Sequence, residues 1–208
     1  MFSKFNKRID TLFVDLNSEN FNTVENVNII LSPALYWVRK ISLPVKNARE
    51  ARNLLPSLFE DILPEGIYSY SVYKEGEDFF IFAYEDKKIL ELLHTKGISS
   101  MQLENVYFSQ SELIDLQNAK KISDAQSIYV KDDIVLLIPS QWTEDALILD
   151  IDGINLSKHS IRLKQFGHIV DDKSFNTLVV IFSILIMLLG MEYFITQKKT
   201  PRHALIKR

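Results

Sequence analysis

The chain has 208 residues, with 24 basic and 27 acidic side chains, a formal net charge of −3 and no cysteine. The absence of cysteine excludes disulfides, thiolate metal sites and a cysteine nucleophile. Without Glu192 and the five basic residues of positions 196–208, 19 basic and 26 acidic residues remain, so the N-terminal part carries about −7. This balance argues against direct nucleic-acid binding and favours a protein partner with a basic face.

The order of apolar runs and turn residues predicts a mixed α/β (α+β) sheet domain, with strands paired by hairpins. Strands are predicted at residues 10–16, 26–31, 34–43, 67–73, 78–84, 101–108, 127–130, 134–138, 146–151 and 160–166. Helices are predicted from Asn47 to just before Pro64, at 86–93 and at 110–117. Asn47 and Glu50 should cap the first helix, and Pro56 should kink or split it. The strand at 78–84 is apolar almost throughout, so we expect it at the centre of a sheet, covered on both faces.

Residues 175–195 form a long apolar run, FNTLVVIFSILIMLLGMEYFI, in which Glu192 is the single charged residue. This length matches the ~20 apolar residues that a helix needs to cross a bilayer core. A buried core helix would normally show a polar face, so we expect a single transmembrane helix. The residues assigned to the membrane-spanning segment are Phe175, Leu178, Leu185, Leu189 and Ile195. The expected domains are a sheet domain at 1–170, the helix at 175–195 and a basic tail at 196–208.

The orientation of this helix follows from two opposing signals. Near the N-terminus there is no apolar run of the 7–15 residues found in a secretory signal, so we expect the sheet domain in the cytoplasm. The distribution of basic residues slightly favours the reverse, with five after the helix and four before it, namely Lys158, Arg162, Lys164 and Lys173. That rule describes short loops and does not decide the side of a whole domain. The expected location is therefore the bacterial inner membrane, single-pass, with the N-terminal domain inside.

The sequence carries few signs of catalytic chemistry. Its six glycines form neither GxxxxGK[ST] nor GxGxxG, and its four histidines lie far apart, so we expect no cofactor and no metal. One segment, LILDIDGIN at 147–155, is similar to the nucleophile motif of haloacid-dehalogenase-type phosphatases. In those enzymes the motif opens the fold, whereas here only about twenty residues separate it from position 175. The favoured interpretation is a strand end that turns at Asp152; the alternative function is a membrane-anchored nucleotide hydrolase or phosphatase that uses Asp150 and Asp152.

Residues 41–98 combine a strand that ends in Leu-Pro, a helix with the sequence LLPSLFEDIL, a hairpin and a second helix that ends in Lys-Gly. This segment resembles the cytoplasmic part of the L component of type II secretion systems and its relative, the M component of type IV pili. Those proteins carry an LP-x(n)-LP-x-x-LE-D-x-L segment. It is matched here by Leu43, Pro44, Leu55, Pro56, Glu60, Asp61 and Leu63, with Phe59 in place of a leucine. The resemblance implies a partial actin-like (ribonuclease H-like) sheet and a reduced protein, in which a 13-residue basic tail replaces the periplasmic ferredoxin-like domain of the L component.

The resemblance also implies a function. The chain is expected to be a non-enzymatic inner-membrane scaffold of a secretion, pilus or DNA-uptake (natural-transformation) apparatus. It would recruit a cytoplasmic assembly ATPase and contact other inner-membrane proteins of that apparatus. The candidate docking residues are Glu60 and Asp61, for a basic partner, and Trp37, as an aromatic anchor. Their alternatives are a solvated acidic face and a half-buried core tryptophan, and the oligomeric state is left open, with a homodimer as one arrangement.

Overall fold

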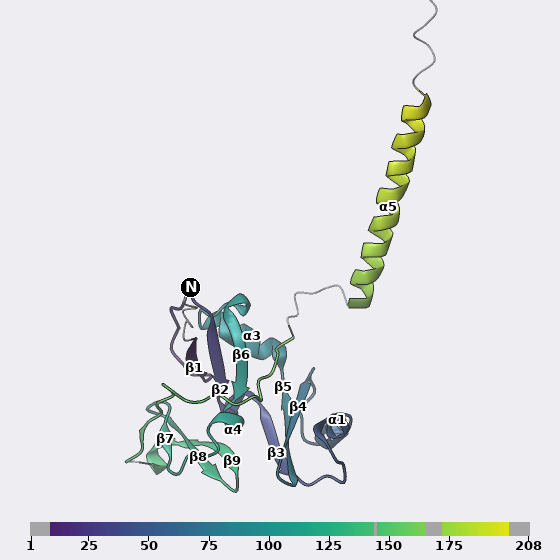
Figure 1. Cartoon of the computed structure of the whole chain (residues 1–208). Helices are drawn as coiled ribbons and strands as arrows, with labels where there is room; N and C mark the ends of the chain where they lie inside the picture. Colours follow the sequence, from purple (N-terminus) through teal and green to yellow (C-terminus); the bar gives the residue numbers. More distant parts are fainter. Residues whose placement is uncertain (1–8, 144, 165–171, 200–208) are drawn as a thin grey trace, which may run out of the picture. The chain divides into compact units, whose positions relative to one another are not determined.

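The computed structural model describes residues 9–143, 145–164 and 172–199, with side chains in the last range described at 177–193. The chain divides into two compact units, residues 1–165 and 166–208. The first unit contains the described strands, and the second contains the long helix α5 (Asp172–Lys199) (Figure 1).

The described strands of the first unit form three sheets. The first sheet is parallel and has the order β1-β2-β6, with β1 (Asp10–Val14), β2 (Val27–Leu31) and β6 (Leu103–Phe108). The second sheet is antiparallel and has the order β3-β5-β4, with β3 (Trp37–Ile41), β4 (Ser69–Glu75) and β5 (Asp78–Tyr84). The third sheet has the order β10-β7-β8-β9, with β7 (Lys120–Lys121), β8 (Gln126–Lys131), β9 (Ile134–Pro139) and β10 (Leu147–Ile148). The expected mixed α/β class is thereby confirmed, while the partial actin-like sheet stays a prediction.

Short helices connect and cover these sheets. The α-helices are α1 (Ala48–Arg52), α2 (Leu55–Phe59), α3 (Asp86–Thr95) and α4 (Ser109–Glu112). The 3-10 turns are η1 (Pro33–Leu35), η2 (Ser100–Gln102) and η3 (Ser140–Trp142). In Figure 1, α1 lies beside the second sheet and α3 beside the first.

Strand β5 separates two apolar cores, because alternate residues of a strand point to opposite faces. Phe80, Phe82 and Tyr84 enter the main core, which also contains residues of the first sheet and α3. The intervening residues Phe79, Ile81 and Ala83 enter the second core, which α1 and α2 cover. The prediction of a central strand covered on both faces is confirmed.

Several predicted elements are shorter than expected, and three of them have a visible cause. The strand predicted at 34–43 begins at Trp37, because Ser32 accepts a hydrogen bond from the Ala34 N–H (3.3 Å) and starts the η1 turn instead. The helix predicted at 110–117 is reduced to α4, since the chain leaves the helical path at Leu113, whose side chain is buried in a third core with Ile128. The strand predicted at 146–151 is reduced to β10, which ends before an Asx turn at residue 150.

The strand predicted at 160–166 is also wrong in part. Its described residues form a single bridge, between Ile161 and Val106 of β6, rather than a ladder. Residues 165 and 166, and the predicted domain boundary at 170, lie outside the described residues. We refer to residues 157–164 as the strap, because this segment contacts α4, β4, β6 and α3 in turn.

Candidate docking surface

The segment that carries Glu60 and Asp61 begins with a capped helix. The Asn47 side chain accepts a hydrogen bond from the Glu50 N–H (3.0 Å), and the Glu50 carboxylate accepts one from the Lys46 N–H (3.1 Å). The first bond satisfies a backbone donor that a helix start leaves without an intrahelical partner, and the second holds the residue before the N-cap. The cap predicted at Asn47 and Glu50 is confirmed, and it fixes where α1 begins.

Pro56 then divides the predicted helix into α1 and α2, as expected. It lies in the first turn of α2, where its missing N–H removes no helical hydrogen bond. The inward side chains Ala51, Leu55 and Phe59 are fully buried in the second core. The two helices therefore pack onto the second sheet, with Ala48 and Leu58 partly buried against the same core.

Trp37 belongs to the wall of this core. It is half-buried, packs against the second core, and meets the Tyr68 ring edge-on with centroids 5.4 Å apart. Leu58 and Leu63, on either side of Glu60 and Asp61 in the chain, pack against the same core. Trp37 and the α2 segment are thus brought together, and part of the Trp37 ring is occupied by core packing.

Glu60 and Asp61 are exposed at the C-terminal end of α2. Exposed apolar residues lie close to them in the chain, with Ile62 at 49% and Ile67 at 78% of its full exposure. Leu54 is exposed as well. We call these five residues the α2 surface. The 3–4-residue spacing of the apolar residues from Ala51 to Ile62 favours one buried face, with either Leu54 or Leu55 on it. The structure buries Leu55 and leaves Leu54 and Ile62 exposed, because periodicity alone cannot tell an exposed isoleucine from a core isoleucine.

The neighbourhood of the α2 surface is held by polar contacts. The Arg39 guanidinium on β3 donates to the Leu58 carbonyl (3.0 Å) near the end of α2, where a cation is favoured by the helix dipole. The Tyr68 hydroxyl donates to the Pro64 carbonyl (3.1 Å). Burial raises the pKa of Tyr68, and the nearby Glu85 carboxylate adds to the increase. These groups keep the loop after α2 in place without using Glu60 or Asp61.

The second predicted site, at Asp150 and Asp152, lies beside a cleft of about 490 Å³. Asp152 lines this cleft together with Asp10, Thr11 and Asn28 of the first sheet, whereas Asp150 does not. The Asp150 carboxylate accepts a hydrogen bond from the Asp152 N–H (2.9 Å), and both side chains are exposed. This is an Asx turn, the geometry expected for a strand end that reverses direction. Among the described residues, no group of three His, Cys, Asp or Glu is placed to hold a metal ion.

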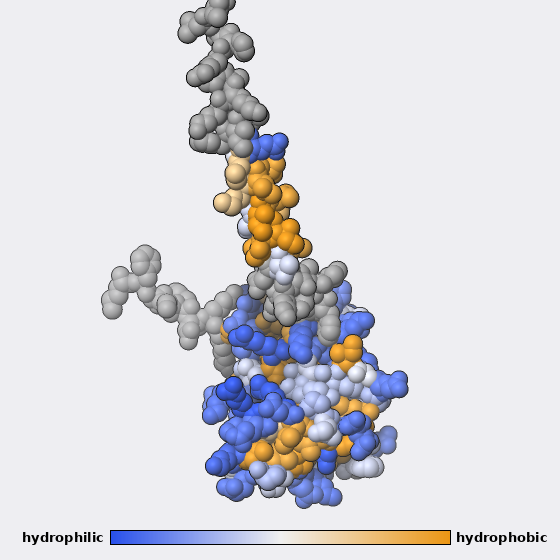
Figure 2. Space-filling model, turned by 90° about the vertical axis from the view of Figure 1, so that its right-hand side faces the viewer, coloured by the Kyte–Doolittle hydropathy of each residue, from blue (hydrophilic) through white to orange (hydrophobic). Residues whose placement is uncertain are grey.

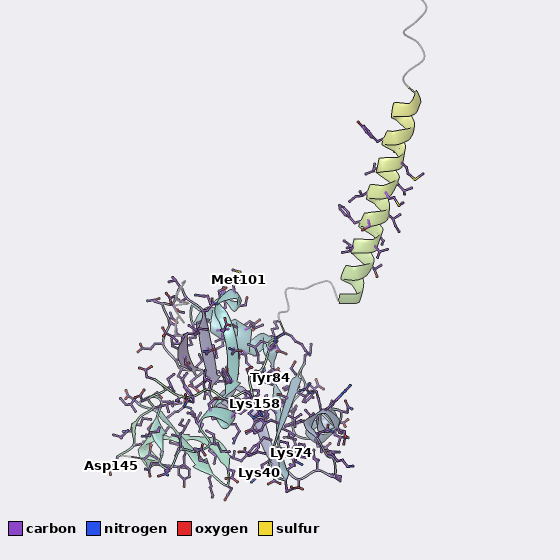
Figure 3. All side chains as sticks on the ribbon, viewed as in Figure 1. Lys40, Lys74, Tyr84, Met101, Asp145 and Lys158 are labelled. Carbon is purple, nitrogen blue, oxygen red and sulfur yellow. The ribbon has the colours of Figure 1, made fainter. Side chains whose placement is uncertain are left out.

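Helix α5 presents apolar side chains on its surface. Their exposure runs from 46% at Val179 to 71% at Met187. Leu178, Leu185 and Leu189 are all more than half exposed, while the side chains of Phe175 and Ile195 lie outside the described residues. The visible face of this helix is orange in Figure 2, and side chains project from opposite sides of it in Figure 3. The Ser183 hydroxyl donates to the Val179 carbonyl (2.8 Å), so this polar group is satisfied within the helix.

No helix was found, within the part of the chain that the structure describes, with the length and apolarity required to cross a membrane.

Comparisons with known proteins find similarity to solved structures. No family model matches the chain, and no curated protein matches it. The chain is similar to the cytoplasmic domain of EpsL, an inner-membrane component of the type II secretion system of Vibrio cholerae, with 16% identity and a TM-score of 0.44. The similarity covers 56% of this chain and 52% of that structure, so the chain spans about half of its length. A likeness of this size does not extend to partners or activity.

Proposed function

We propose that this chain is a non-enzymatic scaffold of the bacterial inner membrane, in a type II secretion, type IV pilus or DNA-uptake apparatus. Residues 1–170 dock a cytoplasmic assembly ATPase, and residues 175–195 hold this docking site at the bilayer as a single transmembrane helix. The domain lies on the cytoplasmic side, followed by the tail at 196–208. Other inner-membrane proteins of the apparatus are its further partners.

The observation that carries the proposal is the exposure of Glu60 and Asp61. These two residues match the acidic positions of the LP-rich segment, and both are exposed on a capped, tightly packed helix pair. Neither forms a hydrogen bond or ion pair with another described residue, so both carboxylates are available to a partner. Exposed Ile62 and Ile67 supply apolar contact area beside these charges. A partner with basic side chains around an apolar patch fits this combination.

The exposure of the α5 side chains supports the membrane half of the proposal. Exposed apolar surface of this extent is unfavourable in water at roughly 25 cal/mol per Å², so it requires an apolar environment. A lipid bilayer provides one over the length of residues 175–195. Anchoring the domain also raises the local concentration of docked ATPase at the membrane without any new contact.

Charge reversal at the α2 surface tests the docking half. In the full chain, Glu60→Lys combined with Asp61→Lys should weaken capture of the assembly ATPase by at least about tenfold, because like charges then face each other. The matched control is Asp115→Lys combined with Asp124→Lys, which alters net charge equally at two exposed residues in the region of the third sheet. Capture that is unchanged by the first pair, or reduced as much by the control, contradicts docking at the α2 surface.

A further inference from the structure

The strap has a strand-like alternation of burial although it forms no ladder. Ser157, His159, Ile161 and Leu163 are turned inward and are half-buried or buried. The residues between them, Lys158, Ser160, Arg162 and Lys164, are all exposed. Burial therefore alternates with a period of two, which divides the strap into an inner and an outer row.

The inner row is fixed at its beginning by α4 and β4. The Glu112 carboxylate accepts two hydrogen bonds from Ser157, from its N–H (2.8 Å) and its hydroxyl (2.6 Å). The His159 ring then stacks on Tyr73 of β4, with centroids 4.4 Å apart and an interplanar angle of 24°. These contacts fix the backbone path of the first half of the strap and determine which of its side chains point inward.

The second half is fixed by β6 and α3. The Ile161 N–H donates to the Val106 carbonyl (2.7 Å), and the Ile161 side chain is buried in the main core. The Lys164 N–H donates to the Asp86 carboxylate (2.8 Å), and Asp86 is itself only 2% exposed and accepts a hydrogen bond from the Ser69 hydroxyl. With both halves anchored, the side chains of Lys158, Arg162 and Lys164 are held outward from one extended segment.

The charge of this outer row differs from that of the rest of the domain. The strap holds three basic residues and no acidic one, while the N-terminal part as a whole has 19 basic and 26 acidic residues. None of the three forms an ion pair with a described residue. Lys158, labelled in Figure 3, is one end of the row. About 3.3 Å per residue places the two ends of the row roughly 20 Å apart.

We propose that the outer row of Lys158, Arg162 and Lys164 binds the anionic headgroups of a phospholipid bilayer. This inference rests on the membrane anchor proposed above. Lys164 precedes α5 by eight residues, and an extended chain of that length reaches at most about 29 Å. Each basic group near an anionic leaflet strengthens binding by about fivefold, and three together by about a hundredfold. A contact of that strength is weak for a free domain and sufficient for a tethered one, since α5 keeps the concentration of lipid around the row high.

The row also sets which side of the domain meets the membrane. The remaining acidic surface is repelled by an anionic leaflet, while the row is attracted to it. The domain is therefore held through this row. Glu60 and Asp61 would be repelled by the same headgroups, which leaves the α2 surface accessible to the ATPase.

A label on the strap tests the inference in the full chain. Because the chain has no cysteine, Ser160→Cys gives one labelled position between Lys158 and Arg162, and Ser57→Cys gives a control on α2. The chain is reconstituted in vesicles of phosphatidylcholine alone or with phosphatidylglycerol, each containing a headgroup-attached quencher. We expect the Ser160→Cys label to be quenched about threefold more in anionic vesicles, and the Ser57→Cys label equally in both. Quenching at Ser160→Cys should fall to the neutral-lipid level in 0.5 M salt, which screens the attraction.

The decisive variant combines Lys158→Gln, Arg162→Gln and Lys164→Gln. It should lower quenching in anionic vesicles to the level of neutral ones, whereas a matched triple variant of exposed residues, Lys46→Gln, Arg49→Gln and Lys131→Gln, should not. The inference is overturned if the triple variant is quenched as strongly as the parent, or if quenching does not depend on phosphatidylglycerol. It is also overturned if the row binds an acidic protein of the apparatus and not the vesicles. Failure of the anchor is seen separately, because the chain would then not float with phosphatidylcholine vesicles, which offer the row no anionic headgroup.

Discussion

Strand β5 and residues 178–191 of helix α5 are both almost entirely apolar, and they differ in burial. Residues Phe79 to Tyr84 of β5 are all buried, because the main core covers one face and the second core covers the other. In α5 the described apolar side chains are exposed. The first element finds its apolar environment within the chain. The two elements differ in burial, so apolar composition alone does not tell a core strand from an exposed helix.

The contrast predicts different responses to loss of an apolar side chain. Phe82 is fully buried and stacks on Phe108 of β6, with centroids 4.3 Å apart. Phe82→Ala should destabilise the sheet unit by about 3–5 kcal/mol, since it removes apolar contacts and leaves a cavity. Urea unfolding of the full chain, followed by circular dichroism, measures this loss. Met101→Ala, at an 87% exposed residue, is the control and should stay within about 0.5 kcal/mol; a Phe82→Ala cost that small would contradict the two-core description.

A charge placed in α5 tests the other side of the comparison. Leu185→Arg should weaken membrane insertion by about 2.5–3.5 kcal/mol, because an arginine at the centre of a spanning helix is costly. The fraction of chain that resists carbonate extraction reports the change, and Leu185→Phe should leave it unaltered. A Leu185→Arg chain that fractionates like the parent would mean that α5 does not reside in lipid.

Two glycines of the sheet unit, Gly97 and Gly76, differ in the space that a Cβ atom would have. Gly97 has φ +85°, and a Cβ there would lie 2.6 Å from the Phe21 carbonyl oxygen. Gly97→Ala should cost about 2–3 kcal/mol, since it adds a clash to the strain of a left-handed backbone. Gly76 has φ +60° with open space around its Cβ position, so Gly76→Ala should cost about 1 kcal/mol. Equal urea midpoints for the two variants would show that the Phe21 contact is unimportant.

The strap lies between the sheet unit and α5 in the sequence, and its packing against the sheet unit should depend on pH. Burial lowers the pKa of His159, as does Lys158 to a smaller extent, while Glu112 and Glu75 oppose them. The docked ring therefore favours the neutral state, and the stability it adds is complete above the unfolded pKa of about 6.5 and is lost as pH falls below that value. Between pH 7.5 and 5.5 the parent should lose about 1–2 °C more in Tm than His159→Phe, which keeps the ring stacking without a titrating group. An identical pH dependence in both would remove His159 from the docking of the strap.

Local patterns predicted the elements better than their pairing. The apolar run at 78–84 predicted β5 and its central place, and the cap at Asn47 and Pro56 predicted α1 and α2. Nothing local indicated that β1, β2 and β6 are parallel. The connection between β1 and β2 is held instead by distant groups, where the Phe21 N–H donates to the Lys96 carbonyl (2.7 Å) and the Gln102 side chain donates to the Thr23 carbonyl (2.7 Å). Such contacts depend on residues more than 70 positions apart, so a window of neighbouring residues contains no trace of them.

In the candidate site, too, local features were predictable and contacts between distant residues were not. Exposure of Glu60 and Asp61 was predictable from their charge, and Asp150 and Asp152 form the turn that the sequence favoured. The packing of Trp37 against Tyr68 was not predictable, because it needs the fold of the second sheet. The strap shows the limit most clearly: the strand predicted from residue 160 is a single bridge in the described residues, and the partners of the strap, Glu112, Tyr73, Val106 and Asp86, come from four different elements.

The central claim is that the sheet unit supplies a docking surface and residues 175–195 supply its location. The most direct test is membrane flotation of the assembly ATPase with the full chain and with a chain that lacks residues 175–208. We predict that the ATPase floats with the full chain, and that both proteins move together to the soluble fraction after the deletion. An ATPase that stays with the membrane when residues 175–208 are removed would contradict the scaffold role of this chain.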